Sequence, residues 1–106
     1  MLELNEGNFK KEVLESKKLA VVDFWAPWCS PCLSLATTFE KLSNEFEGKA
    51  KFAKLNVQDN DGLSQKYGIR GIPCIVVFKE GKEIGRVVGA FPENAFREKL
   101  NSILNP

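Results

Sequence analysis

Two cysteines separated by two residues, Cys29 and Cys32, are the part of this sequence best suited to chemistry. They lie in the segment WAPWCSPC, in which two tryptophans precede them and two prolines are close by. A Cys-x-x-Cys pair is typical of three kinds of site: half of a metal site, a structural disulfide, or a dithiol that is oxidised and reduced in turn. The rest of the chain decides among these three.

The metal and structural alternatives are disfavoured by what the sequence lacks. Tetrahedral zinc usually takes four Cys or His ligands, and the 106 residues contain no His and only one further cysteine, Cys74. We therefore expect no metal and, for thiol exchange itself, no cofactor. An odd number of cysteines argues against a secreted disulfide framework. The first residues, MLELNEGNFKKEV, do not resemble a signal peptide, so we expect the cytoplasm, where thiols are kept reduced.

The redox alternative is favoured by the predicted position of the pair. The segment Leu19–Ala26 is rich in β-formers and predicts a buried strand. After Cys32, apolar residues recur at steps of three and four, which predicts a long helix ended by Gly48. Cys29 then lies where the free amides and positive dipole end of this helix stabilise a thiolate. Pro31 in the first turn costs no hydrogen bond. We expect Cys32, one turn further in, to be more buried and less easily ionised, so that Cys29 attacks and Cys32 resolves.

Strands and helices alternate along the remainder of the chain. Helices between strands favour parallel crossovers, while a terminal hairpin is antiparallel. We expect an α/β fold in a single domain, residues 1–106, with a central mixed sheet of four to five strands and helices on both faces. The other expected elements are an edge strand at Leu2–Leu4, a helix capped by Asn8, a strand at Ala50–Val57, a short helix at Asp59–Gly68, a hairpin of Cys74–Lys79 and Lys82–Val88, and a last helix starting near Pro92.

Over nearly its whole length the sequence resembles the thioredoxin family. The matching segments are VVDFWAPWCSPC (21–32), KLNV (54–57), YGIRGIPC (67–74), FKEGK (78–82) and VGA (88–90). The resemblance implies the thioredoxin fold with about four flanking helices, Cys29 as nucleophile, and a cis peptide bond between Ile72 and Pro73. It also implies a general protein-disulfide reductase. Such a protein acts on disulfide-containing protein substrates and is restored by a thioredoxin reductase or another dithiol donor.

Asp23 is a carboxylate among apolar neighbours in the predicted strand. We expect it to be buried, which raises the pKa of a carboxyl group and allows proton exchange near neutral pH. By resemblance, Asp23 lies behind Cys32 and helps to deprotonate it, and Lys54 is the matching cation on the adjacent strand. From the residues alone two alternatives stay open: Asp23 on a half-exposed strand, and Lys54 as an ordinary solvated lysine.

The loop Gly71-Ile72-Pro73 is the expected second half of the site. A proline entering a strand removes a ladder donor, and a cis proline in a tight loop avoids that problem. Resemblance places this loop against the cysteines, where the Ile72 backbone pairs with an extended substrate segment. For the glycines the alternative is turn geometry, and for Trp28 it is core packing. The apolar collar expected around the cysteines consists of Trp28, Ile72, Pro73, Gly89 and Ala90.

Three positions differ from the commonest thioredoxin sequence. Ser30 replaces a glycine between the cysteines and, with Pro31 and Lys54, is expected to tune the thiol chemistry. Leu33 stands where a lysine is common, which removes a cation and makes the rim more apolar. Cys74 stands where threonine is common; it is either a small buried strand residue or an additional thiol open to oxidation.

Composition excludes several other classes of function. The net charge is +1 with both signs interspersed, so we expect no nucleic-acid partner, and the longest apolar runs are too short to cross a membrane. We expect a monomer. Two alternative functions remain: an oxidase or isomerase on the same fold, disfavoured by the lack of His between the cysteines, and a binding module that uses the apolar collar.

Overall fold

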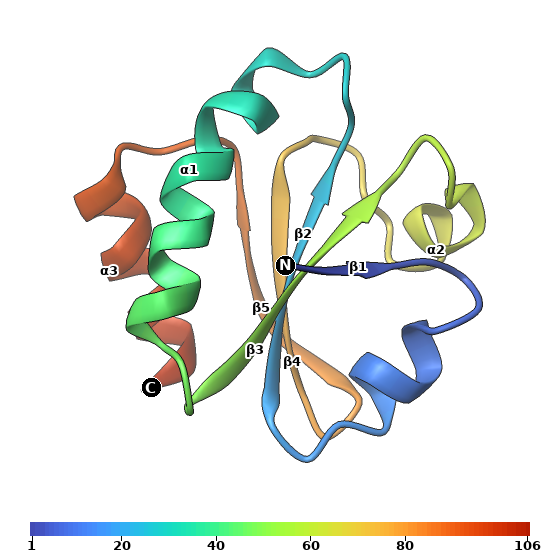
Figure 1. The fold of residues 1–106 in the computed structure, drawn as a ribbon, viewed down its shortest axis with the longest axis horizontal. Coiled ribbons are helices and arrows are strands. Elements are labelled where there is room, and N and C mark those ends of the chain that lie inside the picture. The colour runs from blue at the N-terminus through green and yellow to red at the C-terminus, as the bar shows by residue number, and fades with distance from the viewer.

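The computed structural model describes residues 1–106 and contains one five-stranded sheet, in the order β1-β3-β2-β4-β5 (Figure 1). Parallel pairing joins β1 to β3 and β3 to β2, whereas β4 runs antiparallel to both β2 and β5. The predicted mixed α/β sheet is therefore confirmed. The strands are β1 (Leu2–Leu4), β2 (Leu19–Trp25), β3 (Ala50–Asn56), β4 (Cys74–Lys79) and β5 (Lys82–Val88).

Helices cover both faces of this sheet, and each face has its own core (Figure 1). Successive strand residues point to opposite faces, so Val21 packs under α1 and α3 while Val22 and Phe24 pack towards η1 and α2. The apolar face predicted for the long helix, from Leu35 to Phe46, is buried in the first of these cores. The helices are η1, a π-helix (Lys10–Leu14), α1 (Ser30–Glu45), α2 (Asp61–Lys66) and α3 (Glu93–Leu104).

The first helix differs from its prediction. It is a five-residue π-helix whose preceding residue is Phe9, and no side chain caps it. The expected cap, Asn8, is wrong because its side chain closes the preceding turn: the Asn8 Oδ1 accepts a hydrogen bond from the Asn5 amide at 2.7 Å. Local bonding of this kind competes with helix capping. Phe9 and Val13 of this segment are buried against the sheet.

The ends of several other helices and strands differ from the predicted ends by one to three residues, as is common for frayed termini. The first helix residue after the proline is Glu93, because Pro92 has extended backbone (φ −56°, ψ 154°). The long helix ends at Glu45, and Gly48 adopts φ +89° in the turn that follows. Both hairpin strands have the predicted bounds.

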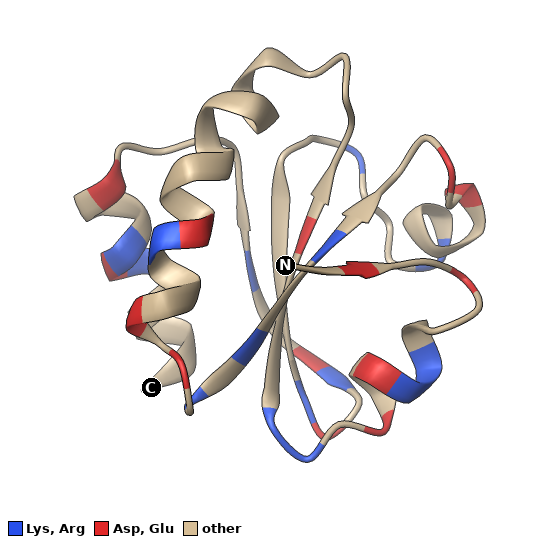
Figure 2. Ribbon diagram, viewed as in Figure 1, with Lys and Arg blue, Asp and Glu red and all other residues tan.

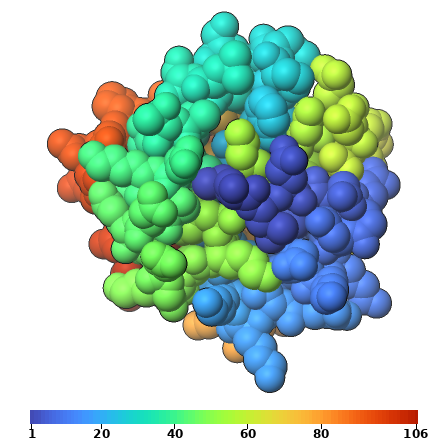
Figure 3. Space-filling view, viewed as in Figure 1, coloured from blue at the N-terminus to red at the C-terminus, as the bar shows by residue number.

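The chain's first residues lie across the sheet edge, between α1 and the α2 region (Figure 3). They pair with β3 through Leu2, Glu3 and Leu4, which confirms the predicted edge strand. Acidic and basic residues are mixed over the surface, and the first turns of α1 carry neither (Figure 2). No helix is both long and apolar enough to cross a membrane.

Candidate functional site

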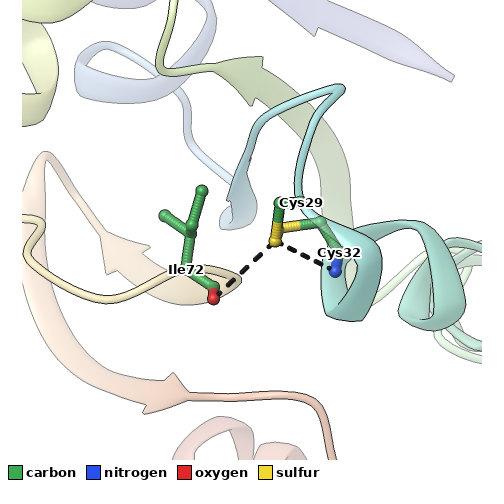
Figure 4. Close-up of a disulfide and its surroundings, with 3 residues drawn as sticks. All are labelled: Cys29, Cys32 and Ile72. Carbon is green, nitrogen blue, oxygen red and sulfur yellow. Dashed lines mark hydrogen bonds between the residues drawn. A yellow bond between two sulfur atoms is a disulfide. The ribbon is translucent and has the colours of Figure 1, made fainter.

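The two cysteines lie where β2 gives way to α1. The backbone of Cys29 is extended and precedes the first residue of the helix, Ser30. The amide of Cys32 donates a hydrogen bond to the Cys29 Sγ at 3.2 Å (Figure 4). Pro31 occupies the first turn, where its missing amide has no partner to lose. The geometry confirms the prediction that Cys29 stands at the helix N-terminus.

Cys29 and Cys32 form a disulfide with Cα atoms 5.2 Å apart, inside the range of ordinary disulfides. Cys32 is more buried than Cys29, as expected, but the difference is small: Cys29 is 5 % exposed and Cys32 2 %. The two sulfurs differ instead in their surroundings. The helix amide is directed at Cys29, and it stabilises negative charge on that sulfur rather than on Cys32.

The loop before β4 meets the cysteines from the other side. The Ile72 carbonyl oxygen lies 3.9 Å from the Cys29 Sγ (Figure 4). In the disulfide this is a contact, and in the reduced protein the Cys29 thiol has a proton to donate to it. The Ile72–Pro73 peptide is cis. The Pro73 carbonyl accepts a hydrogen bond from the Gly89 amide at 2.8 Å, which joins two parts of the expected collar.

The collar is only partly at the surface. Trp28 is 68 % exposed, so the alternative of core packing is wrong for this residue. Gly71 and Ala90 are exposed and Ile72 and Gly89 are half-buried, whereas Pro73 is buried and supports the others from beneath. The exposed surface beside the cysteines is therefore formed by Trp28, by Gly71 and Ile72 of one loop, and by Gly89 and Ala90 of the other.

Three residues around this surface were not selected from the sequence. Val57 and Arg70 line a groove of about 210 Å³ beside Trp28 and Ile72, and Val88 is 52 % exposed next to Gly89. The only available signal was their membership of the matching segments KLNV, YGIRGIPC and VGA. Leu33 is also exposed, at 52 %, in the first turn of α1.

Asp23 is fully buried, which excludes the half-exposed alternative. Neither of its carboxylate oxygens accepts a hydrogen bond from a protein group. Burial raises the pKa of Asp23 to about 7, and the Lys54 ammonium opposes that rise. The carboxyl group therefore changes its charge near neutral pH. No hydrogen bond joins it directly to Cys32.

Lys54 lies directly opposite Asp23 on β3, as predicted. It forms no ion pair with Asp23 or with any other carboxylate. Its Nζ instead lies 4.2 Å from the centroid of the Trp25 ring, a cation–π distance. The lysine is neither simply solvated nor directly paired.

Cys74 belongs to the core on the η1 and α2 face, whereas Cys29 and Cys32 cluster with Ala26. It is 1 % exposed, and burial raises the pKa of its thiol while Arg86 partly opposes this. Cys74 is thus a small core residue. No group of three or more Cys, Asp or Glu side chains is placed to hold a metal ion.

A disulfide between two cysteines at a helix N-terminus, beside an exposed tryptophan and a backbone carbonyl, is typical of a protein that exchanges thiols and disulfides with other proteins. The Thioredoxin family model matches residues 1–102. The chain is 46 % identical to Thioredoxin 2 of Chlorobaculum tepidum over 93 % of its length and 91 % of the relative's. It is 40 % identical to the thioredoxin of a Synechocystis species over 96 % and 95 % of the two lengths.

The chain therefore belongs to the thioredoxin family. It is a protein-disulfide oxidoreductase with the thioredoxin fold, and the resemblance drawn from the sequence is confirmed. Membership implies disulfide-containing substrates and a reductase that restores the dithiol.

Proposed function

We propose that this chain is a general protein-disulfide reductase in which Cys29 attacks the substrate and Cys32 resolves the mixed disulfide. One observation carries the assignment: the Cys32 amide, in the first turn of a 16-residue helix, donates to the Cys29 Sγ at 3.2 Å. An amide donor and the helix dipole both favour a thiolate, which is the attacking form.

Substrate binding begins on the exposed surface around Trp28. An extended segment of the substrate lies against Trp28, Gly71, Ile72, Gly89 and Ala90, with Pro73 beneath them. The Ile72 carbonyl accepts a hydrogen bond from a substrate amide, as in the addition of a strand. Because that carbonyl is 3.9 Å from the Cys29 Sγ, the same contact brings a substrate disulfide to the attacking sulfur.

The exchange takes two steps. The Cys29 thiolate attacks one substrate sulfur, forms a mixed disulfide and expels the other substrate sulfur as a thiolate, which takes a proton from solvent. The Cys32 thiol then gives its proton to Asp23, and the Cys32 thiolate attacks the Cys29 sulfur. The second substrate thiolate leaves and the Cys29–Cys32 disulfide forms. Two electrons pass to the substrate, and a flavoprotein reductase or another dithiol donor returns two electrons to the protein.

Asp23 suits the role of proton acceptor because its pKa is about 7. Near neutral pH such a group is present in both forms, so it can take the proton from Cys32 and later release it. Lys54, Ser30 and Pro31 tune the site: Lys54 by its charge opposite Asp23, Ser30 by its exposed hydroxyl between the cysteines, and Pro31 by fixing the first turn.

We place the protein in the cytoplasm as a monomeric single domain. A reductant needs surroundings that keep its dithiol reduced, and the cytoplasm provides them. The two cores share one sheet, which supports a domain that folds as one unit. Sedimentation of the reduced and oxidised protein measures the oligomeric state directly, and a dimer in both forms would contradict this assignment.

The roles of the two thiols are tested by a pair of variants. Cys32→Ser is expected to hold a disulfide-bonded substrate as a stable mixed disulfide at Cys29, because the resolving thiol is gone. Cys29→Ser is the matched control and should trap nothing. Trapping by Cys29→Ser alone would reverse the roles. A double serine variant that still binds and serves a partner normally would favour a binding module.

The reduction potential separates a reductase from an oxidase or isomerase. The protein is equilibrated against a dithiol buffer and the Cys29–Cys32 pair is followed. For thioredoxin as a class the potential is about −270 mV, and we expect a value in that region. A potential above about −200 mV would indicate an oxidising member of the fold and would contradict the proposal.

A further inference from the structure

A row of charged side chains crosses three strands beneath the active site. Lys54 of β3 is in register with Glu3 of β1 on one side and with Asp23 of β2 on the other. Figure 2 shows acidic and basic segments adjacent where these strands run side by side. Registered residues share a face of the sheet, so the lysine lies between an exposed carboxylate and a buried one.

The ammonium of Lys54 pairs with neither of these carboxylates. Neither carboxylate oxygen of Asp23 has a hydrogen-bond partner, although the residue directly opposite on β3 is a lysine, Lys54. The Nζ lies instead 4.2 Å from the ring of Trp25. Trp25 is two residues beyond Asp23 on β2, on the same face of the sheet. The Trp25 ring therefore binds the Lys54 ammonium, which would otherwise be the natural partner of the buried Asp23 carboxylate.

We propose that Trp25 is a positioning residue of the exchange reaction, whose indole face holds the Lys54 ammonium out of contact with the Asp23 carboxyl group. Held in this way, Lys54 acts on Asp23 from a distance, and the carboxyl group remains free to take a proton from Cys32. The inference rests on the proposed role of Asp23 as proton acceptor.

The destination of Lys54 without the ring follows from its surroundings. Lys54 lines an open groove of about 300 Å³ together with Glu3, Asn56 and Asp59. Glu3 and Asp59 are exposed, so solvent and salt screen their attraction for the ammonium. Asp23 is buried, its attraction is not screened, and it has no competing donor. An ammonium released from the ring is therefore drawn to ionised Asp23.

Other groups that face Asp23 do not compete for this role. Asp23 is on the sheet face that α1 covers, and the cysteine pair at the start of α1 has no proton to exchange while it is a disulfide. From β4 the residue in register is Ile75, and the neighbouring Cys74 points into the opposite core. Lys54 is the sole cation that affects Asp23 appreciably.

The test is a titration of the Asp23 carboxyl carbon by NMR in the oxidised protein, where neither Cys29 nor Cys32 titrates. Trp25→Leu is expected to lower the midpoint of Asp23 by about one pH unit, because an opposite charge in contact stabilises a carboxylate by at least that much. Trp25→Phe keeps an aromatic face and should shift the midpoint less; it also serves if the leucine variant folds poorly. Lys54→Met should raise the midpoint.

A double variant isolates the role of the lysine. In the Lys54→Met background, Trp25→Leu is expected to leave the Asp23 midpoint unchanged, because the ring then has no cation to hold. An equal fall in both backgrounds would mean that the indole acts by excluding water, and it would overturn the inference. A rise in the midpoint on Trp25→Leu would overturn it as well, since the ring would then be holding Lys54 towards Asp23.

A kinetic measurement distinguishes this inference from the proposed function. The rate at which Cys32 resolves a mixed disulfide is followed against pH in the wild type and in Trp25→Phe. If the profile moves with the Asp23 midpoint, both statements stand. If the midpoint moves and the profile does not, Trp25 still positions Lys54, but Asp23 is not the proton acceptor and Trp25 is not a positioning residue of the reaction.

Discussion

Asp23 and Cys74 are two buried ionisable groups on neighbouring strands of one sheet, and they have opposite uses. Phe24 of β2 is in register with Cys74 of β4, so Asp23 and Cys74 are close along the sheet but face different cores. Burial raises the pKa of both groups. For the thiol this leaves a neutral, apolar side chain at every ordinary pH, whereas for the carboxyl group it brings the charge change to neutral pH.

The comparison shows that burial alone does not make a functional group. A neutral thiol costs little in a core, because it behaves as a small apolar side chain. An ionised carboxylate without a hydrogen bond is expensive in the same setting. Ionised Asp23 therefore destabilises the folded protein. It lies on the sheet face that is covered by α1, the helix that begins at the cysteine pair.

The largest expected effect separates the thiol of Cys29 from that of Cys74. Cys29→Ser should abolish reduction of a disulfide-bonded protein, because the attacking sulfur is lost. Cys74→Ala should leave the rate within about a factor of two, because Cys74 is buried in the other core. The assay is reduction of a protein disulfide with a dithiol as electron donor.

Alkylation of the reduced native protein gives a second view of the same comparison. The reagent should modify Cys29 and spare Cys74, whose thiol is both buried and shifted to higher pKa. Rapid labelling of Cys74 would break the comparison, because the thiol would then be reachable and ionised.

The next effect concerns stability, and it belongs to Asp23 alone. The folded state retains the Asp23 proton up to a pKa of about 7, while the unfolded state releases it near 3.8. The folded state thus binds more protons between these values, and the free energy of unfolding falls as pH rises through that window. Asp23→Asn should be more stable than the wild type by about 4 kcal/mol at pH values above 7, with the difference closing towards pH 4.

Urea unfolding of the oxidised proteins across this pH range measures the difference. Asp59→Asn is the matched control, because Asp59 is exposed and near the same strand ends. It should show little change at any pH. A stability gain for Asp23→Asn that stays constant with pH would contradict the assigned titration.

Much of this arrangement was predictable from the sequence, for a physical reason. The alternation of apolar runs and helical spacing fixes which residues are buried, so the strands, the long helix and the position of Cys29 at its N-terminus were all predicted. Burial of Asp23 followed from its apolar neighbours. The cap at Asn8 was not predicted correctly, because the Asn8 side chain closes the preceding turn through a single local hydrogen bond.

The contact between Lys54 and Trp25 shows the limit of such reasoning. The family resemblance places Lys54 on the strand next to Asp23 as its matching cation, and the residues alone left a solvated lysine as the alternative. The three-dimensional structure places the ammonium on a ring instead. Lys54 is flexible and has several possible partners within reach. Which partner it binds depends on side-chain packing, which residue spacing in the sequence does not determine.

A smaller effect is expected when Cys74 is shortened. Cys74→Ala removes a buried sulfur atom from the core on the η1 and α2 face, opposite Phe24, and leaves a small cavity. We expect a loss of roughly 1 kcal/mol in the free energy of unfolding, at the lower end of the costs of large-to-small changes. The loss should not depend on pH below 8, in contrast to Asp23→Asn. A pH-dependent loss would mean that the thiol is partly ionised in the folded protein.

The smallest effects are expected from the ion pairs that flank each core at the surface. On the Asp23 face, Arg97 of α3 binds Glu45 of α1 through two hydrogen bonds, at 2.7 and 2.9 Å. On the Cys74 face, Lys51 of β3 binds Glu12 of η1 at 2.9 Å. Both pairs are partly exposed. Such pairs contribute little in water, and a bidentate guanidinium contributes more than an ammonium.

Arg97→Met should therefore lower the melting temperature slightly, and Lys51→Met should lower it less. Both differences should shrink in about 1 M salt, which screens exposed charges. A thermal melt of the two variants at low and high salt measures this. If Lys51→Met were the more destabilising change and salt did not reduce it, then η1 would depend on this contact for its docking. The two faces would then differ in how their helices are held as well as in the group each one buries.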